Sequence, residues 1–172
     1  MDFRYKGKED LTNSVSLLIS ILIRYPEVAR INFDPEHNLL KFTFMYAGVL
    51  QENEIVQLKE KIISSIEVFH VLEGKSPRVV QLAYEISDAL TMIEIERDVD
   101  TLVQGEITLM VDLFRGYVQE SLVTEESDRP NDEDLLVQEE LIEHMLESIK
   151  RKSETKRLYA FREEGRVLVF NK

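Results

Sequence analysis

A helix-like segment followed by a β-hairpin pattern occurs three times along the sequence, and this recurrence limits the fold more than any other feature. In each unit, apolar residues first repeat every three or four positions and then alternate with polar residues around a short turn. These two periodicities are typical of an amphipathic helix and of strands with one buried face. The units cover residues 11–45, 52–97 and 132–171. They share no residue-level identity, so we infer a recurring architecture without a repeated sequence.

Turn residues interrupt the alternation at the centre of each hairpin pattern. The predicted turns are Asp34-Pro35-Glu36-His37, Ser87-Asp88-Ala89 and Glu163-Glu164-Gly165. Proline, aspartate and glycine favour such positions because they either fix the backbone angle φ or tolerate positive values of it. The sequence therefore predicts three hairpins at these positions.

Four helices are expected between and around these hairpins. The first begins at Asp10, Thr12 or Asn13 and ends at Tyr25, because the residue before a proline avoids helical geometry. The others are expected at about 52–72, at about 98–120 and from residue 131 or 132 onward. Gly105 costs a helix interior about 1 kcal/mol relative to Ala. The third helix is therefore expected to start at Asp98 or Asp100, or else nearer Gly105.

These elements predict an α+β fold of two layers, in which an antiparallel sheet is covered by helices on one face. The expected order is αββ-αββ-α, an acidic linker, and a final αββ unit. Residues 1–120 are expected to form the core domain, and the acidic, aperiodic stretch 121–134 a flexible linker. Residues 135–172 are expected to form an arm of one helix and the terminal hairpin. Whether that hairpin joins its own sheet or another chain's stays open.

The residue types that are missing restrict the chemistry. The chain has no Cys, which excludes disulfides, thiolate nucleophiles and Cys-based metal sites. The N-terminus lacks the apolar core of a signal peptide, and the most apolar run, residues 15–23, is about half the length of a membrane span. We therefore expect a cytoplasmic protein without membrane contact. Nucleophile motifs and phosphate-binding glycine loops are also missing, so nothing favours an enzyme and no cofactor is expected.

Two groups of residues are candidate metal ligands. Glu140 and His144 lie four positions apart and share one helix face, although a solvated acidic face is the simpler explanation of the pair. Alternating carboxylates after the second turn could hold Mg²⁺ or Ca²⁺, but the solvent-facing side of a half-buried strand also predicts them. These carboxylates are Glu94, Glu96, Asp98 and Asp100. His70 is expected to interact with the dipole at the end of its helix.

Charge is distributed unevenly, and the terminal segment differs from the rest. Residues 94–149 carry 17 Asp or Glu and 3 Lys or Arg, whereas residues 150–172 carry 3 and 8. Arg157, Arg162 and Arg166 are candidate anion contacts beside aromatic residues, a combination that suits single-stranded nucleic acid. Both faces of the hairpin are apolar, however, which favours burial against a sheet or a partner. The candidate interaction residues are Leu158, Tyr159, Phe161, Val167, Val169 and Phe170.

Three functional hypotheses follow from these observations. The first is a non-catalytic cytoplasmic protein–protein interaction or regulatory module that dimerises through the C-terminal helix and hairpin. The second is a nucleic-acid-associated protein that uses the basic hairpin, which the acidity of residues 94–149 disfavours. The third is a metal-assisted hydrolase that uses the carboxylates and His144.

Overall fold

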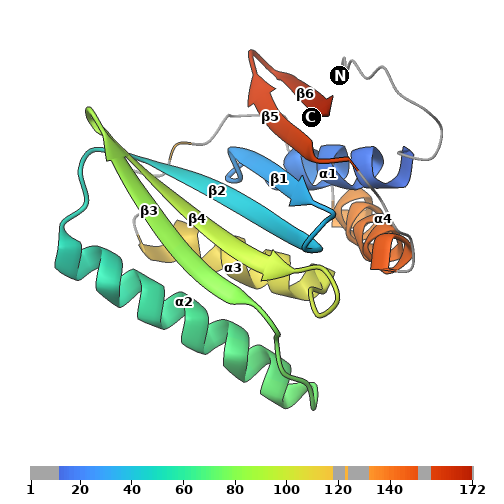
Figure 1. Ribbon diagram of the computed structural model, residues 1–172, viewed down its shortest axis with the longest axis horizontal. Helices are drawn as coiled ribbons and strands as arrows, with labels where there is room; N and C mark the ends of the chain where they lie inside the picture. Colours follow the sequence, from blue (N-terminus) through green and yellow to red (C-terminus); the bar gives the residue numbers. More distant parts are fainter. Residues whose placement is uncertain (1–11, 118–122, 124–131, 151–155, 172) are drawn as a thin grey trace.

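The computed structural model describes residues 12–117, 123, 132–150 and 156–171, which form an α+β fold as predicted (Figure 1). A single antiparallel sheet has the strand order β3-β4-β2-β1-β5-β6. The helices are α1 (Thr12–Arg24), α2 (Glu52–Leu72), α3 (Gln104–Tyr117) and α4 (Asp132–Lys150). The strands are β1 (Arg30–Asp34), β2 (Leu39–Ala47), β3 (Val80–Ser87), β4 (Leu90–Asp98), β5 (Leu158–Glu163) and β6 (Arg166–Asn171).

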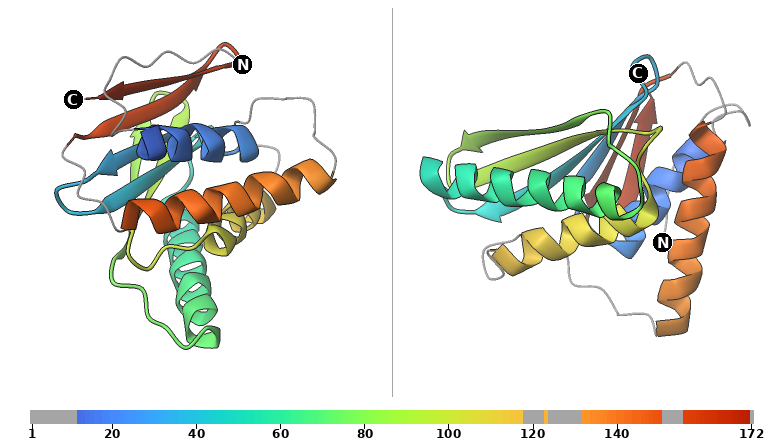
Figure 2. Two further views of the ribbon diagram at one scale, coloured as in Figure 1. Left: turned by 90° about the vertical axis from the view of Figure 1, so that its right-hand side faces the viewer. Right: turned by 90° about the horizontal axis from the view of Figure 1, so that it is seen from below.

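All four of these helices lie on one side of the sheet, which confirms the predicted two-layer arrangement (Figure 2). The amphipathic pattern explains this, since α1, α2 and α3 bury apolar stripes toward the inner face of the sheet and α4 packs against α1 and α3. None of the described helices combines the length and the apolar character needed to cross a lipid bilayer.

The three predicted hairpins all form, and their turns use residues with positive φ. Asn38, Asp88 and Glu164 have φ values of 55°, 53° and 49°. Gly165 follows Glu164 with φ of 76°, so two successive residues with positive φ close the hairpin between β5 and β6. Such a turn matches the right-handed twist of its strands. A residue other than Gly at 165 would be strained.

The terminal hairpin joins the sheet of its own chain. Strand β5 pairs antiparallel with β1, with Ile31 opposite Ala160, and β6 then forms the outer strand. Strand β1 is therefore an interior strand, with β2 on one side and β5 on the other. This placement answers the question that the sequence left open about the hairpin.

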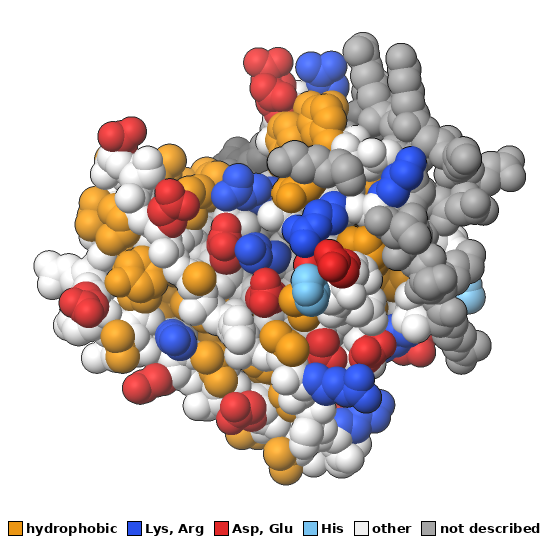
Figure 3. Space-filling view, in the orientation of Figure 1, with side chains coloured by type: hydrophobic (Ala, Val, Ile, Leu, Met, Phe, Trp, Pro, Cys, Tyr) orange, Lys and Arg blue, Asp and Glu red, His pale blue; other side chains and the backbone are white. Residues whose placement is uncertain are grey.

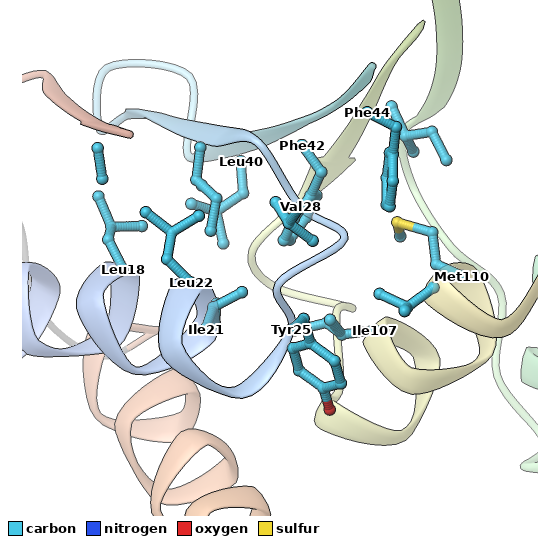
Figure 4. Packing of buried hydrophobic residues seen from close by; sticks show 14 of the residues in the cluster. Leu18, Ile21, Leu22, Tyr25, Val28, Leu40, Phe42, Phe44, Ile107 and Met110 are labelled. Carbon is cyan, nitrogen blue, oxygen red and sulfur yellow. The ribbon is translucent and has the colours of Figure 1, made fainter. Parts of the chain in front are cut away.

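One apolar core fills the space between the sheet and the helices. Leu18 and Leu22 of α1 point toward β1 and β2, and Met110 of α3 points toward Phe44 of β2 (Figure 4). The Phe44 and Phe114 rings stack with centroids 3.8 Å apart and planes 16° apart. The stripes predicted from sequence spacing thus meet in a continuous cluster.

The start of α3 differs from the simplest expectation. The helix begins at Gln104 and not at Asp98 or Asp100, which agrees with the alternative start near Gly105. Asp98 is the last residue of β4, and its carboxylate accepts hydrogen bonds from the Thr101 backbone N–H (2.9 Å) and hydroxyl (2.7 Å). It therefore holds the turn before α3 and does not cap the helix.

The outer face of the sheet carries the alternate side chains of each strand. Charged groups of both signs lie over its middle, with hydrophobic groups towards its ends (Figure 3). Glu94 lies 3.8 Å from Arg30 and 3.7 Å from Lys41, so the central charges are already paired across strands. Cross-strand pairs of this kind stabilise neighbouring strands.

Candidate functional site

The six candidate interaction residues of the terminal hairpin divide between the two faces of the sheet. Leu158, Val167 and Val169 are buried in the core of their own chain. Tyr159 and Phe161 are half-buried, and Phe170 is exposed. The Phe161 and Phe170 rings stack with centroids 5.6 Å apart. Only the aromatic half of the set is therefore accessible to a partner.

The three arginines of this hairpin were candidate anion contacts, and two of them contact their own chain. Arg157 donates to Asp34 (3.2 Å) in the turn between β1 and β2. Arg162 donates to the backbone oxygens of Val28 (3.0 Å) and Leu22, where α1 ends. A guanidinium at this position complements the negative end of the helix dipole. Arg166 is half-buried.

Three of the four candidate carboxylates in and after β4, namely Glu94, Asp98 and Asp100, have partners of their own. Glu94 is paired with Arg30 and Lys41, and Asp100 accepts from Asn38 (3.0 Å). Among the described residues, the one group of three that could hold a metal ion is Asp34, Glu36 and His37 in the exposed first turn. Glu140 and His144 do not belong to such a group.

The Asp34 carboxylate organises that first turn. It accepts hydrogen bonds from the backbone N–H of Glu36 (3.1 Å) and from the His37 ring (2.8 Å). Partial burial opposes the charge on Asp34, but hydrogen bonds from the ring and the backbone N–H of His37, together with the Arg157 charge, outweigh it and lower the pKa of Asp34. The hydrogen bond to Asp34 in turn raises the pKa of His37. These contacts account for the cluster as turn structure.

A buried charged cluster combines side chains of α2, β4 and α3 beneath the sheet. Arg97 and Glu106 are both fully buried and form a bidentate ion pair. Arg97 Nε lies 2.5 Å from Glu106 Oε2, and Arg97 Nη2 lies 2.8 Å from Glu106 Oε1. Arg97 also donates to Val79 O (2.9 Å) and pairs with Asp98. His70 Nε2 pairs with the same Glu106 oxygen. The cluster, which we call the Arg97 cluster, comprises His70, Arg97, Asp98 and Glu106.

Acid should weaken this region through Asp98. Burial opposes its charge, but hydrogen bonds from Thr101 and Val79, with the Arg97 charge, outweigh burial and lower the pKa of Asp98. A lowered folded-state pKa contributes stability that is complete above the unfolded value, about 4, and is lost as pH falls through the folded value. We expect Asp98→Asn to be less stable at pH 7 and to lose less stability on acidification below pH 4.

Urea unfolding between pH 7 and pH 2.5, followed by circular dichroism, measures this effect. Asp100→Asn is the matched control, because it removes the same charge at a nearby, exposed position. The role of Asp98 would be contradicted if the free energy of unfolding of Asp98→Asn fell as steeply with decreasing pH as that of the unsubstituted protein.

A cavity of about 500 Å³ lies where the end of α2, the start of α3 and α4 meet. His70 belongs to both the Arg97 cluster and the cavity wall, whereas Arg97 and Glu106 do not line the cavity. The wall also includes Phe69, Glu73, Gln104, Glu140 and Glu143. Glu143 accepts from the Gln104 backbone N–H (2.8 Å), and this places a carboxylate at the positive end of α3.

Strand β3 forms one edge of the sheet and is exposed along most of its length. Its outer side pairs with no strand of the described chain. Tyr84 and Ile86 are 47% and 42% exposed although they belong to the helix-facing side of the strand. The strand carries one charged residue, Glu85, and lacks the Lys and Pro residues that commonly protect sheet edges.

Sequence reasoning missed the Arg97 cluster, although two signals were present. Arg97 continues the alternation of Ile93 and Ile95, which assigns it to the buried face of β4. His70 follows Ile66 by four positions and so continues the buried stripe of α2. A charged residue at an apolar position indicates a buried partner of opposite charge, because an unpaired buried charge is very costly.

Comparison with family models, with curated proteins and with solved structures found no match for this chain. What the molecule offers to partners and ligands therefore follows from its own surface. The two features that stand out are the free edge of β3 and the cavity at the end of α2.

Proposed function

We propose that the protein is a non-catalytic interaction module that associates with a second copy through the free edge of β3. The exposed, unpaired outer side of that strand is the observation that carries the proposal. The predicted arm is a weaker candidate for the dimer contact, since its hairpin already pairs with β1. Nucleic-acid binding has less support, since Arg157 and Arg162 contact their own chain.

The backbone of β3 is suitable for adding a strand. The Val79 N–H points toward β4, where it donates to Asp98 Oδ1 (2.9 Å). Successive residues of a strand direct their N–H and C=O groups to opposite edges. Val80, Leu82, Tyr84 and Ile86 therefore direct theirs away from β4, to the free edge. Water satisfies these groups in the monomer, and a second strand would satisfy them in a dimer.

The side chains of β3 match a second copy in one antiparallel register. With a two-fold axis at Ala83, the small Ala83 side chains face each other across the axis. Leu82 then lies opposite Tyr84 of the second copy. Val80 lies opposite Ile86 in the same way. Such apolar and aromatic cross-strand pairs stabilise a sheet, and they would cover the exposed parts of Tyr84 and Ile86.

The charges near β3 favour the same register. Arg78 precedes the strand and would lie opposite Asp88 of the second copy, which gives one opposite-charge pair at each end. Glu85 would lie opposite Gln81, so no like charges meet. A two-fold contact of this kind is closed and yields a dimer with one continuous sheet.

We expect Ala83→Lys to weaken dimerisation roughly tenfold, equal to about 1.4 kcal/mol. Ala83 is exposed on the outer face, so the monomer tolerates the larger side chain, but in the dimer the two lysines would meet at the axis. Sedimentation velocity over a range of protein concentrations measures the dissociation constant. Ala47→Lys is the control, because it makes the same substitution at an exposed position of β2.

Arg78→Glu tests the register, because it replaces a guanidinium with a carboxylate opposite Asp88 of the second copy and should also weaken the dimer. The ion pair of Arg78 with Asp100 within the monomer is exposed and long (3.4 Å), so the fold should be unaffected. A monomer at all concentrations up to about 0.5 mM, or equal dimerisation of Ala83→Lys and Ala47→Lys, would refute the proposal.

A further inference from the structure

The cavity between α2, α3 and α4 has an excess of negative charge. Glu139 forms an ion pair with Arg24 of α1 (2.7 Å), and Glu143 accepts a hydrogen bond from the first backbone N–H of α3. Glu73 and Glu140 also line the cavity and have no ion pair among the described residues. Among the described residues that line the cavity, Lys75 is the one with a positive charge. Two carboxylates are therefore available to a ligand in the cavity.

His70 adds a buried polar atom whose hydrogen bonding is incomplete. Its side chain is 1% exposed, and Nε2 pairs with the Glu106 carboxylate. Since an ionised carboxylate only accepts hydrogen bonds, a ring hydrogen lies on Nε2, and in the tautomer that carries this single hydrogen Nδ1 keeps a lone pair. Nδ1 is buried and has no partner within the described part of the chain. Such atoms are uncommon in folded proteins.

The orientation of the ring directs Nδ1 away from the Arg97 cluster. Nε2 faces Glu106 and lies 3.2 Å from Arg97 Nη2, and neither of those residues lines the cavity. His70 does line it, and Nδ1 is the ring nitrogen that does not face the cluster. The ring of Phe69, whose centroid is 5.5 Å from that of His70, lies beside it in the same wall.

We propose that this cavity binds a small organic ammonium ion. Glu73 and Glu140 supply the negative charge, Nδ1 of His70 accepts an N–H hydrogen bond, and the Phe69 ring offers its face to the cation. An amine with an alkyl chain also suits the apolar part of the wall, which includes Val103 and Leu136. The volume of about 500 Å³ is sufficient for a molecule of this size.

The chemistry of the wall favours an amine over a metal ion or an anion. A metal site needs several ligand atoms close together, and the lining carboxylates do not form such a group with His70. An anion would meet the two carboxylates without partners. None of the lining residues belongs to β3, so the inference does not depend on dimerisation.

Isothermal titration calorimetry with 1,4-diaminobutane tests the proposal on the full chain. We expect a dissociation constant below about 1 mM that rises with salt, and no heat with the neutral 1,4-butanediol. Glu73→Gln/Glu140→Gln should bind about tenfold more weakly. Glu133→Gln, an exposed change on α4 outside the cavity, should bind as the unsubstituted protein does.

His70→Gln separates the ring's two roles. The Gln amide can still donate a hydrogen bond to Glu106, but the substitution removes the Nδ1 acceptor. A folded variant that binds the amine more weakly therefore supports the inference. A Gly-Lys-Gly peptide with acetylated and amidated ends tests whether the ammonium group belongs to a protein partner. Binding of this peptide that is lost in Glu73→Gln/Glu140→Gln would identify a partner's lysine side chain as the ligand. The proposed amine site would be refuted by the absence of any amine binding or by binding of Zn²⁺ alone. Equal amine binding by the Glu73→Gln/Glu140→Gln variant and the unsubstituted protein would also refute it.

Discussion

Arg97→Met is expected to destabilise the fold by about 3–5 kcal/mol, because it leaves buried carboxylates without their cation. Arg97 and Glu106 are both fully buried, and Asp98 is nearly so. Methionine fills much of the same volume, so the loss comes chiefly from electrostatics and hydrogen bonding. The measurement is the free energy of unfolding in urea at pH 7, followed by circular dichroism.

A double variant distinguishes this cause from a packing defect. Arg97→Met/Glu106→Leu removes the central ion pair of the cluster, and replacing a buried ion pair with apolar side chains is often close to neutral. Asp98 stays buried without its cation but keeps its hydrogen bonds from Thr101 and Val79, so we expect the double variant to recover part of the stability that Arg97→Met loses. If Arg97→Met lowered the free energy of unfolding by less than about 1 kcal/mol, the cluster would not be a major source of stability.

Leu158→Ala is expected to lower the free energy of unfolding by about 2–5 kcal/mol, and it addresses the role of the terminal hairpin. Leu158 is fully buried and lies in β5 opposite Phe33 of β1. Its loss leaves a cavity in the core shared with α1. Phe170→Ala removes a larger side chain that is 53% exposed, and it should cost less than about 1 kcal/mol.

Amide hydrogen exchange locates the effect within the fold. If the hairpin is part of a single cooperative unit, Leu158→Ala should accelerate exchange of the Ile31 amide in β1 and of amides in α1. Faster exchange confined to residues 156–171 would instead mean that the hairpin unfolds as a separate unit, as expected for an independent arm.

The secondary structure of this chain could be predicted largely from local chemistry. The second helix was expected at 52–72 and lies there, because Gly74 and Pro77 end the apolar stripe. The turn at Ser87-Asp88-Ala89 was found because it interrupts a clear two-residue alternation. Such signals are local, so neighbouring residues are sufficient to determine them.

The sheet order and the Arg97 cluster could not be predicted in the same way. Pairing of β5 with β1 depends on residues far apart in the sequence. Alternation of apolar and polar residues shows that a strand has a buried face, but it does not identify the strand with which it pairs. The Arg97 cluster combines side chains from α2, β4 and α3. The cavity depends on where α4 lies relative to α2 and α3, and local sequence patterns do not determine that position. The predicted linker, 121–134, lies mostly outside the described residues.

The position of β1 between β2 and β5 has a consequence for how the protein is made. During synthesis, Ile31 leaves the ribosome long before Ala160, its neighbour in the sheet. Until β5 follows, one edge of β1 and the adjacent side of α1 stay open, which are features that promote misassociation of nascent chains. The early strands should therefore complete their packing only after β5 and β6 have emerged. Folding that waits for distant segments is slow, so this chain is expected to need protection by chaperones while it is being translated.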